Sequence, residues 1–167
     1  MPGPVWLRGP IEGVPALLQP VAHALVEAEE DIRALVTSLS PEAVWRRPGG
    51  AASVGYHVCH AVGSLDRLFT YARGEGLSEA QLAALAAEKT LSAKSATPSQ
   101  LVEQFAAAIE HALEQLRVTD ESRLLEKREV GRARLPSNVI GLLVHAGDHT
   151  YRHVGQAITT AKIVTGG

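Results

Sequence analysis

The stretch "NVIGLLVHAGDHTYRHVGQAITTAKIV", residues 138–164, contains no proline and three histidines. Ser137 or Asn138 suits the position before a helix, because either side chain can accept a hydrogen bond from a free N–H of the first turn. The stretch therefore predicts one long helix from that point to about Val164. A long helix with an apolar side must bury it against partner helices, so this segment favours a helical bundle.

Three further segments have the same character. Over residues 14–39 the apolar positions alternate at spacings of four and three, which is typical of a helix with one buried stripe. Pro15 fits the first turn of that helix, and Pro20 can bend it. A second helix is expected over residues 53–73, with Ser53 as N-cap. A third begins with the capping box "TPSQ" at residues 97–100 and reaches about residue 116.

The connections differ in length. "SEAQLAALAAEK", residues 78–89, predicts a short extra helix between the second and third long helices. Ser40-Pro41 and "RRPGG", residues 46–50, indicate a loop, and residues 119–136 indicate a long, charged, irregular connection. The pattern predicts an all-α fold, a four-helix bundle with a short extra helix, as a single domain over residues 1–167. The order of the helices around the bundle does not follow from spacing.

Composition narrows the functional class. Residues with hydrophobic side chains make up 46% of the chain, enough for one core, and the net charge of −2 offers no basic surface for nucleic acid. The N-terminal sequence is too rich in Pro and Gly for a signal peptide or a membrane span. The single cysteine excludes an internal disulfide and fits a reducing compartment. We expect a soluble, cytoplasmic protein without a nucleic-acid or membrane partner.

His145, His149 and His153 follow one another at intervals of four residues. Two histidines at this spacing lie about 6 Å apart along a helix axis and can share a metal ion. The first and the last of the three are about 12 Å apart and cannot. At most one adjacent pair therefore binds a common ion, and a third ligand has to come from another helix.

The second helix offers that ligand in "YHVCH", where His57 and His60 lie on a strip that flanks the apolar face. Ser64, Arg67 and Tyr71 continue the strip. One histidine from this helix and two from the last helix would form a site with three nitrogen ligands. Such a site leaves coordination positions open for water or substrate, which is typical of catalytic rather than structural metal sites.

A competing interpretation is a solvated polar face. His149 and His153 point almost away from the clearest apolar stripe of the last helix, although Leu142, Ala146 and Ala157 lie beside them. This stripe consists of Ile140, Val144, Gly147, Tyr151, Val154 and Ile158. The solvated face would suit a non-catalytic helical module, for example a homodimer.

Two other chemistries are disfavoured by single residues. Thr150 occupies the position after the first histidine of "HTYRH", where a zinc protease of the His-Glu-x-x-His type needs glutamate. Cys59 has no evident activating neighbour in its helix, so an inert packing role is favoured over a reactive thiol.

Both histidine regions resemble the DinB-like superfamily of bacterial proteins. The resemblance is strongest in "VGYHVCHAVGSLDRLFTYARGE" (residues 54–75) and "LPSNVIGLLVHAGDHTYRHVGQAITTAKIV" (residues 135–164), and it extends to "LSPEAVWRRPGG" (residues 39–50). It implies a bundle with up-down-down-up helix order and a divalent metal ion, zinc or nickel, held by three histidines. The ligands then correspond to His60, His149 and His153.

The resemblance also implies roles around the ligands. His57 and His145 become hydrogen-bond partners of ligands, and Gln156 matches a glutamine that follows the last ligand. Members often have glutamate before the first histidine of the pair, where this chain has Asp148, so the role of Asp148 stays open.

Relatives with a known reaction are thiol S-transferases and isomerases that use bacillithiol, mycothiol or glutathione, and others are described as metal-dependent hydrolases. A metal-coordinated thiol is deprotonated and becomes a nucleophile. The first hypothesis is therefore a metal-dependent enzyme, a thiol S-transferase or hydrolase, with a small-molecule substrate and in some cases a low-molecular-weight thiol as cofactor. The alternative is a non-catalytic homodimeric helical-bundle module.

Overall fold

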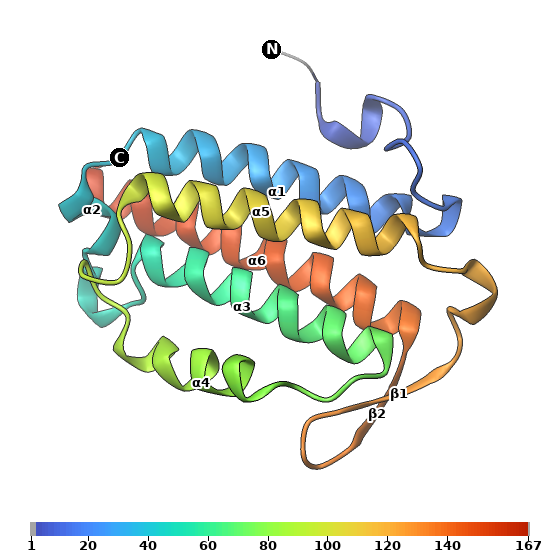
Figure 1. The fold of residues 1–167 in the computed structure, drawn as a ribbon. Helices are drawn as coiled ribbons and strands as arrows, with labels where there is room; N and C mark the ends of the chain where they lie inside the picture. The colour runs from blue at the N-terminus through green and yellow to red at the C-terminus, as the bar shows by residue number, and fades with distance from the viewer. Residues whose placement is uncertain (1–2, 167) are drawn as a thin grey trace.

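Four long helices form the body of the protein in the computed structural model, which describes residues 3–166 (Figure 1). Helices α1 and α6 run in one direction and α3 and α5 in the other, the up-down-down-up order that the resemblance implied. Helix α1 packs against α5 and α6, and α3 packs against the same two helices. The bounds are α1 Gln19–Thr37, α3 Val54–Arg73, α5 Pro98–Arg117 and α6 Val139–Thr165. The predicted all-α bundle is confirmed.

The core between these helices is largely aliphatic. Phe69 and Phe105 are the two large aromatic side chains in it, and both are at most 2% exposed. Burial of one Leu, Ile or Phe side chain contributes about 1.5–3 kcal/mol. The largest aliphatic side chains that are fully buried come from α1, α5 and α6 and from the turn before α1: Leu18, Leu25, Ile32, Leu101, Ile109, Leu116 and Leu143.

The predicted N-caps fix where the histidine-bearing helices begin. Ser53 Oγ accepts a hydrogen bond from the Tyr56 backbone N–H at 3.1 Å, and Asn138 Oδ1 accepts one from Gly141 at 2.8 Å. Thr97 and Gln100 form a capping box at the start of α5. These contacts satisfy N–H groups that have no partner within the helix.

The first helix begins later than predicted. Residues Ala16–Leu18 form a 3₁₀ turn, and α1 starts only at Gln19 instead of near Val14. The physical reason is proline: Pro20 lacks a backbone N–H and fits the first turn, where that N–H has no helical partner. Pro20 therefore belongs to the start of the helix and is not a bend within it.

The expected loop at residues 40–50 contains a short helix, α2 (Pro41–Trp45), so the prediction of a plain loop was wrong. Ser40 caps α2 by accepting from the Ala43 N–H at 3.2 Å. The Trp45 indole N–H donates to the Ala96 carbonyl at 3.0 Å. A Cβ at Gly55 would lie only 2.8 Å from the Trp45 ring, so this glycine lets α2 pack directly on the first turn of α3.

The segment of residues 119–136 is also more regular than predicted. It contains an antiparallel hairpin of β1 (Lys127–Val130) and β2 (Leu135–Asn138), in which Lys127 pairs with Asn138 and Val130 with Leu135. β1 has the sequence Lys-Arg-Glu-Val and β2 the sequence Leu-Pro-Ser-Asn, and no residue of either strand is buried, so the sequence lacks the apolar alternation of a half-buried strand. Asn138 ends β2 and caps α6, which ties the hairpin to the last helix.

The short extra helix predicted at residues 78–89 is present as α4 (Glu79–Ala87), followed by a 3₁₀ turn, Glu88–Thr90. We call residues 79–90 the strap, because they run alongside α3 outside the bundle (Figure 1). The residues of the strap are exposed except Gln81 and Glu88, which are largely covered. Gln81 Nε2 ties the strap to α3 by donating to Asp66 at 2.7 Å and to Thr70 at 2.8 Å.

Within the described residues 3–166, no helix combines the length and the apolar character needed to cross a bilayer.

Candidate metal centre

Three histidine side chains from two helices converge between α3 and α6. His60 comes from α3, and His149 and His153 come from adjacent turns of α6. One ring nitrogen of each lies within 4.8 Å of the others, and this is the one such group of potential ligands within residues 3–166. His60 Nε2 is 3.1 Å from His149 Nε2, and the ring centroids of His60 and His153 are 4.5 Å apart. The structure thus brings together the three residues that the sequence analysis selected.

The predicted apolar stripe of the last helix was partly wrong. Val144 is 50% exposed and Tyr151 42% exposed, although both were assigned to the buried side. Helix α6 packs against α1 on one side and α3 on the other, so its buried arc is wider than one stripe and extends toward the histidines. The buried residues on that arc include Leu142, Leu143, Ala146 and Ala157. His149 and His153 therefore lie half-buried at the edge of the α3–α6 interface and do not form a free polar face.

A carboxylate from the strap contacts the first of these histidines. Glu88 Oε2 accepts a hydrogen bond from His60 Nδ1 at 2.7 Å, and Glu88 Oε1 accepts one from Arg67 Nη1 at 2.8 Å. The Glu88 and Arg67 side chains are each 11% exposed. Because Nδ1 carries the proton in this bond, the lone pair of a neutral His60 is on Nε2, which faces His149. A carboxylate in this position orients a metal-binding histidine and increases its basicity.

Glu88 was not predicted from the sequence. It lies in the strap, 28 residues after His60, and no motif marks it. The sequence placed Arg67 on the polar strip of α3 but gave it no partner. In the structure its partner is Glu88, and Arg67 is only 9% exposed. The sequence offered one indirect indication of Glu88. It has a polar strip on α3 and a glutamate in the connection that follows this helix, and only the two together suggest a contact.

His57 contacts the cluster from the neighbouring turn of α3. Its Nδ1 lies 3.0 Å from His153 Nδ1, and His57 is 8% exposed. One of the two nitrogens must donate and the other accept. When His153 donates, its Nε2 keeps a lone pair for an ion. This contact agrees with the hydrogen-bonding role that the resemblance implied for His57.

Burial favours the uncharged form of His149 and His153. Burial lowers the pKa of His149 and of His153, and the neighbouring His60 lowers both further; the pKa of His153 falls to about 4. Burial likewise lowers the pKa of His57. At neutral pH these rings therefore have free lone pairs, the state that metal binding requires. A set of imidazole nitrogens with a carboxylate behind one ring fits a divalent ion such as zinc or nickel.

Other residues near the motif stay outside the cluster. His145 is exposed, and its ring centroid is 5.5 Å from that of His149. Asp148 forms an ion pair with Arg152, one turn along the surface of α6. Gln156 is exposed.

Cys59 lies next to His60 in the sequence. Burial, with a smaller contribution from the charge of Glu88, raises the pKa of Cys59 to about 11. It is a protonated thiol at neutral pH, in line with the packing role that was favoured from the sequence.

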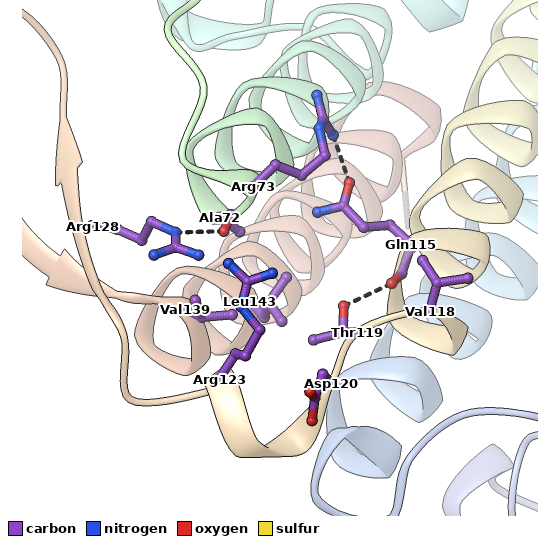
Figure 2. Close-up of a pocket in the computed structure, with 10 residues that line it drawn as sticks. All are labelled: Ala72, Arg73, Gln115, Val118, Thr119, Asp120, Arg123, Arg128, Val139 and Leu143. Atoms are coloured by element: carbon purple, nitrogen blue, oxygen red, sulfur yellow. Dashed lines mark hydrogen bonds between the residues drawn. The ribbon is translucent and has the colours of Figure 1, made fainter.

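A separate cavity of about 250 Å³ lies at the other end of α3 (Figure 2). Arg128 Nε donates to the Ala72 carbonyl at 2.7 Å, and Arg73 Nη1 donates to Gln115 Oε1 at 2.6 Å. Arg123 pairs with Glu126. These arginines are already occupied by a helix-end carbonyl, a side-chain amide oxygen and a carboxylate, so this region closes the end of the bundle.

Comparison with known proteins places the fold. No curated protein matches the chain. A conserved protein of known structure from Enterococcus faecalis is 21% identical and covers 90% of this chain and 98% of its own, with a TM-score of 0.68. A protein from Exiguobacterium sibiricum, described as a candidate member of the DinB family, is 18% identical and covers 91% of this chain and 94% of its own, with a TM-score of 0.70. At these identities the two structures establish the fold alone.

The family assignment comes from sequence. The model of the DinB superfamily matches residues 24–157, a range that includes all three clustered histidines and the strap. With the helix order and the histidine cluster described above, the match leads to one conclusion: the chain belongs to the DinB superfamily.

Proposed function

We propose that the protein is a metal-dependent enzyme that holds a divalent ion with His60, His149 and His153 and acts on a small molecule. The observation that carries the proposal is the approach of three ring nitrogens to within 4.8 Å of one another. Three protein ligands leave coordination positions open, as in catalytic sites. A divalent ion bound there supplies Lewis-acid charge that lowers the pKa of a thiol or of water.

The surrounding residues have distinct tasks in this proposal. Glu88 accepts the Nδ1 proton of His60 and fixes the ring so that Nε2 points to the ion. Arg67 balances the charge of Glu88 in a site with little solvent. His57 accepts from His153 and fixes the second ring in the same way.

The hydrogen bonding of Glu88 favours thiol S-transfer over hydrolysis. Within residues 3–166, Glu88 is the one carboxylate that contacts the cluster. Both oxygens of Glu88 are already hydrogen-bonded, one to His60 and one to Arg67. Glu88 is therefore poorly placed as the general base that hydrolysis by water needs. A thiol needs less help, because metal coordination alone deprotonates it.

Metal analysis and a conjugation assay test the proposal together. We expect one zinc or nickel ion per chain, and conjugation of bacillithiol, mycothiol or glutathione to monochlorobimane above the uncatalysed rate, abolished by chelator. His149→Ala should lose the ion, because removing one of three ligands weakens binding by at least about a hundredfold. His111→Ala is the matched control, since His111 lies on α5 with its side chain 67% exposed.

The same assay separates the competing function. A protein that binds no ion from zinc or nickel solutions, and whose melting temperature ignores both metal and chelator, contradicts the proposal. The non-catalytic helical module would then be the better description. A protein that binds metal but conjugates no thiol would instead direct attention to hydrolysis.

A further inference from the structure

A cavity of about 290 Å³ lies beside the histidine cluster, between the start of α3 and the end of the strap. We call it the Arg47 cavity. Its walls include Arg47, Ser53, Tyr56, Glu88 and Lys89. Sites for small molecules typically have volumes of about 300–1,000 Å³, so this cavity suits a small ligand or one end of a larger one.

Two of these wall residues also touch His60. The Tyr56 ring stacks on the His60 ring with a centroid separation of 5.7 Å and an interplanar angle of 6°. Glu88 Oε2 accepts the hydrogen bond from His60 Nδ1. The cavity therefore lies next to the candidate metal centre, because Tyr56 and Glu88 both line the cavity and contact His60.

The charges around the cavity are unbalanced. Arg47 donates only to neutral backbone carbonyls, to Ala51 from Nε and to Gly50 from Nη2, both at 3.3 Å. Among the described residues, Lys89 has neither a hydrogen bond nor an ion pair from its side chain. The negative charge of Glu88 is already engaged by Arg67 and His60. Two cations thus face the cavity without a carboxylate of their own.

The backbone adds to this positive character. The cavity lies at the N-terminal end of α3, a helix of 20 residues whose macrodipole places partial positive charge there. Ser53 caps the helix from the cavity wall. An anionic group in the cavity would be stabilised by the guanidinium, the ammonium and the helix end together.

From these contacts we propose that the Arg47 cavity binds the anionic end, a carboxylate or phosphate, of the small molecule whose reacting atom reaches the three-histidine centre. Arg47 and Lys89 are the residues that recognise it. The inference rests on the proposed metal-dependent function and specifies its substrate class. A neutral analogue of the same length should bind less tightly, because it leaves the two cations uncompensated.

The test uses cobalt-loaded protein, in which visible absorption reports both the metal and the arrival of a thiol. The probes are ω-mercaptocarboxylates of increasing chain length, each compared with the mercaptoalcohol of equal length. At the length that spans the cavity and the centre, the acid should bind about tenfold tighter than the alcohol, as one charge-assisted hydrogen bond provides. Pantetheine and its 4′-phosphate form the corresponding pair that tests phosphate instead of carboxylate.

The double variant R47Q/K89Q should lose this preference and keep its cobalt spectrum. Lys89→Gln alone breaks no hydrogen bond among the described residues and should lose part of the preference, so a folding defect cannot imitate the result. The double variant K94Q/R132Q removes the same charge from exposed positions outside the cavity and should bind like the unaltered protein.

The outcomes separate the two proposals. Absence of a cobalt spectrum refutes the metal-dependent function, and the cavity inference fails with it. A normal cobalt spectrum with equal binding of acid and alcohol at every length, and of pantetheine with and without phosphate, overturns the cavity inference alone. A preference for the anion that survives in R47Q/K89Q also overturns it.

Discussion

Two carboxylate–arginine pairs lie near the histidines, one between the strap and α3 and one on the surface of α6. Asp148 and Arg152 alternate with the α6 histidines in the sequence, yet their side chains are 58% and 55% exposed. Glu88 and Arg67 are remote from that motif in the sequence, and their side chains are each 11% exposed. Only Glu88 of the two carboxylates bonds to a histidine of the cluster.

The difference shows that burial matters more than neighbourhood in the sequence. An exposed ion pair one turn apart on a helix contributes about 0.3–0.5 kcal/mol and is screened by salt. A buried pair with hydrogen bonds on both carboxylate oxygens holds its groups in one geometry, because an unpaired charge there is costly. The strap therefore contributes more to the candidate site than the residue directly before His149.

Neutralising each carboxylate in turn tests the difference between the two pairs most directly. Glu88→Gln removes the charge that orients His60 and should weaken zinc or cobalt binding by about 10–100-fold, as loss of such partners does elsewhere. Asp148→Asn removes a surface charge and should change the affinity by less than about twofold. Competition with a chromophoric chelator measures both affinities.

A third variant separates a local effect on His60 from a loss of fold. Glu88→Asp keeps the charge on a shorter side chain and should recover part of the affinity. Equal losses in Glu88→Gln and Asp148→Asn would contradict the importance of the buried pair.

The predictable part of the site was the part encoded within one helix. The spacing of His149 and His153 follows from helix geometry, and the histidine from the second helix was expected because three ligands were needed. The choice of His60 over His57, and of the pair His149 and His153 over His145 and His149, came from family resemblance. Glu88 could not be predicted, because its position depends on the path of the strap across α3, which no local pattern encodes.

The fold shows the same limit. The caps at Ser53, Thr97 and Asn138 are local hydrogen bonds and were predicted correctly. The side of α6 that is buried depends on two neighbouring helices, so the stripe was wrong at Val144 and Tyr151. The surface hairpin has too few buried side chains to produce a periodic signal.

A glycine offers a subtler test of the strap contact. A Cβ at Gly63 would lie 2.8 Å from Arg67 Nη1 and 2.9 Å from Glu88 Oε1, whereas a Cβ at Gly155 would meet nothing within 4 Å. Gly155→Ala should stabilise the protein by up to about 1 kcal/mol through helix propensity. Gly63→Ala should forfeit that gain and weaken metal binding about fivefold, because it displaces the buried pair from His60.

Thermal unfolding without metal and a metal titration measure the two effects separately. Equal stabilisation of both alanine variants, with unchanged metal affinity, would mean that the Arg67–Glu88 pair adjusts without cost. That outcome would leave the strap as a neighbour of the site instead of a support for it.

The smallest expected effect is a pH dependence of stability, which distinguishes the half-buried histidine cluster from the exposed face of α6. Burial lowers the pKa of His153 in the folded protein to about 4, from an ordinary value of 6.5. The unfolded chain then binds more protons than the folded one between these two values, so the metal-free protein is fully stable, in this respect, above pH 6.5 and loses stability as the pH falls toward 4. Because His153 is only half-buried, the loss is discounted to about 1 kcal/mol, which corresponds to a fall in melting temperature of about 2–4 °C. His153→Asn cannot titrate and should show a flatter pH profile in the same melting series, whereas identical slopes for both proteins would mean that solvent reaches the ring freely.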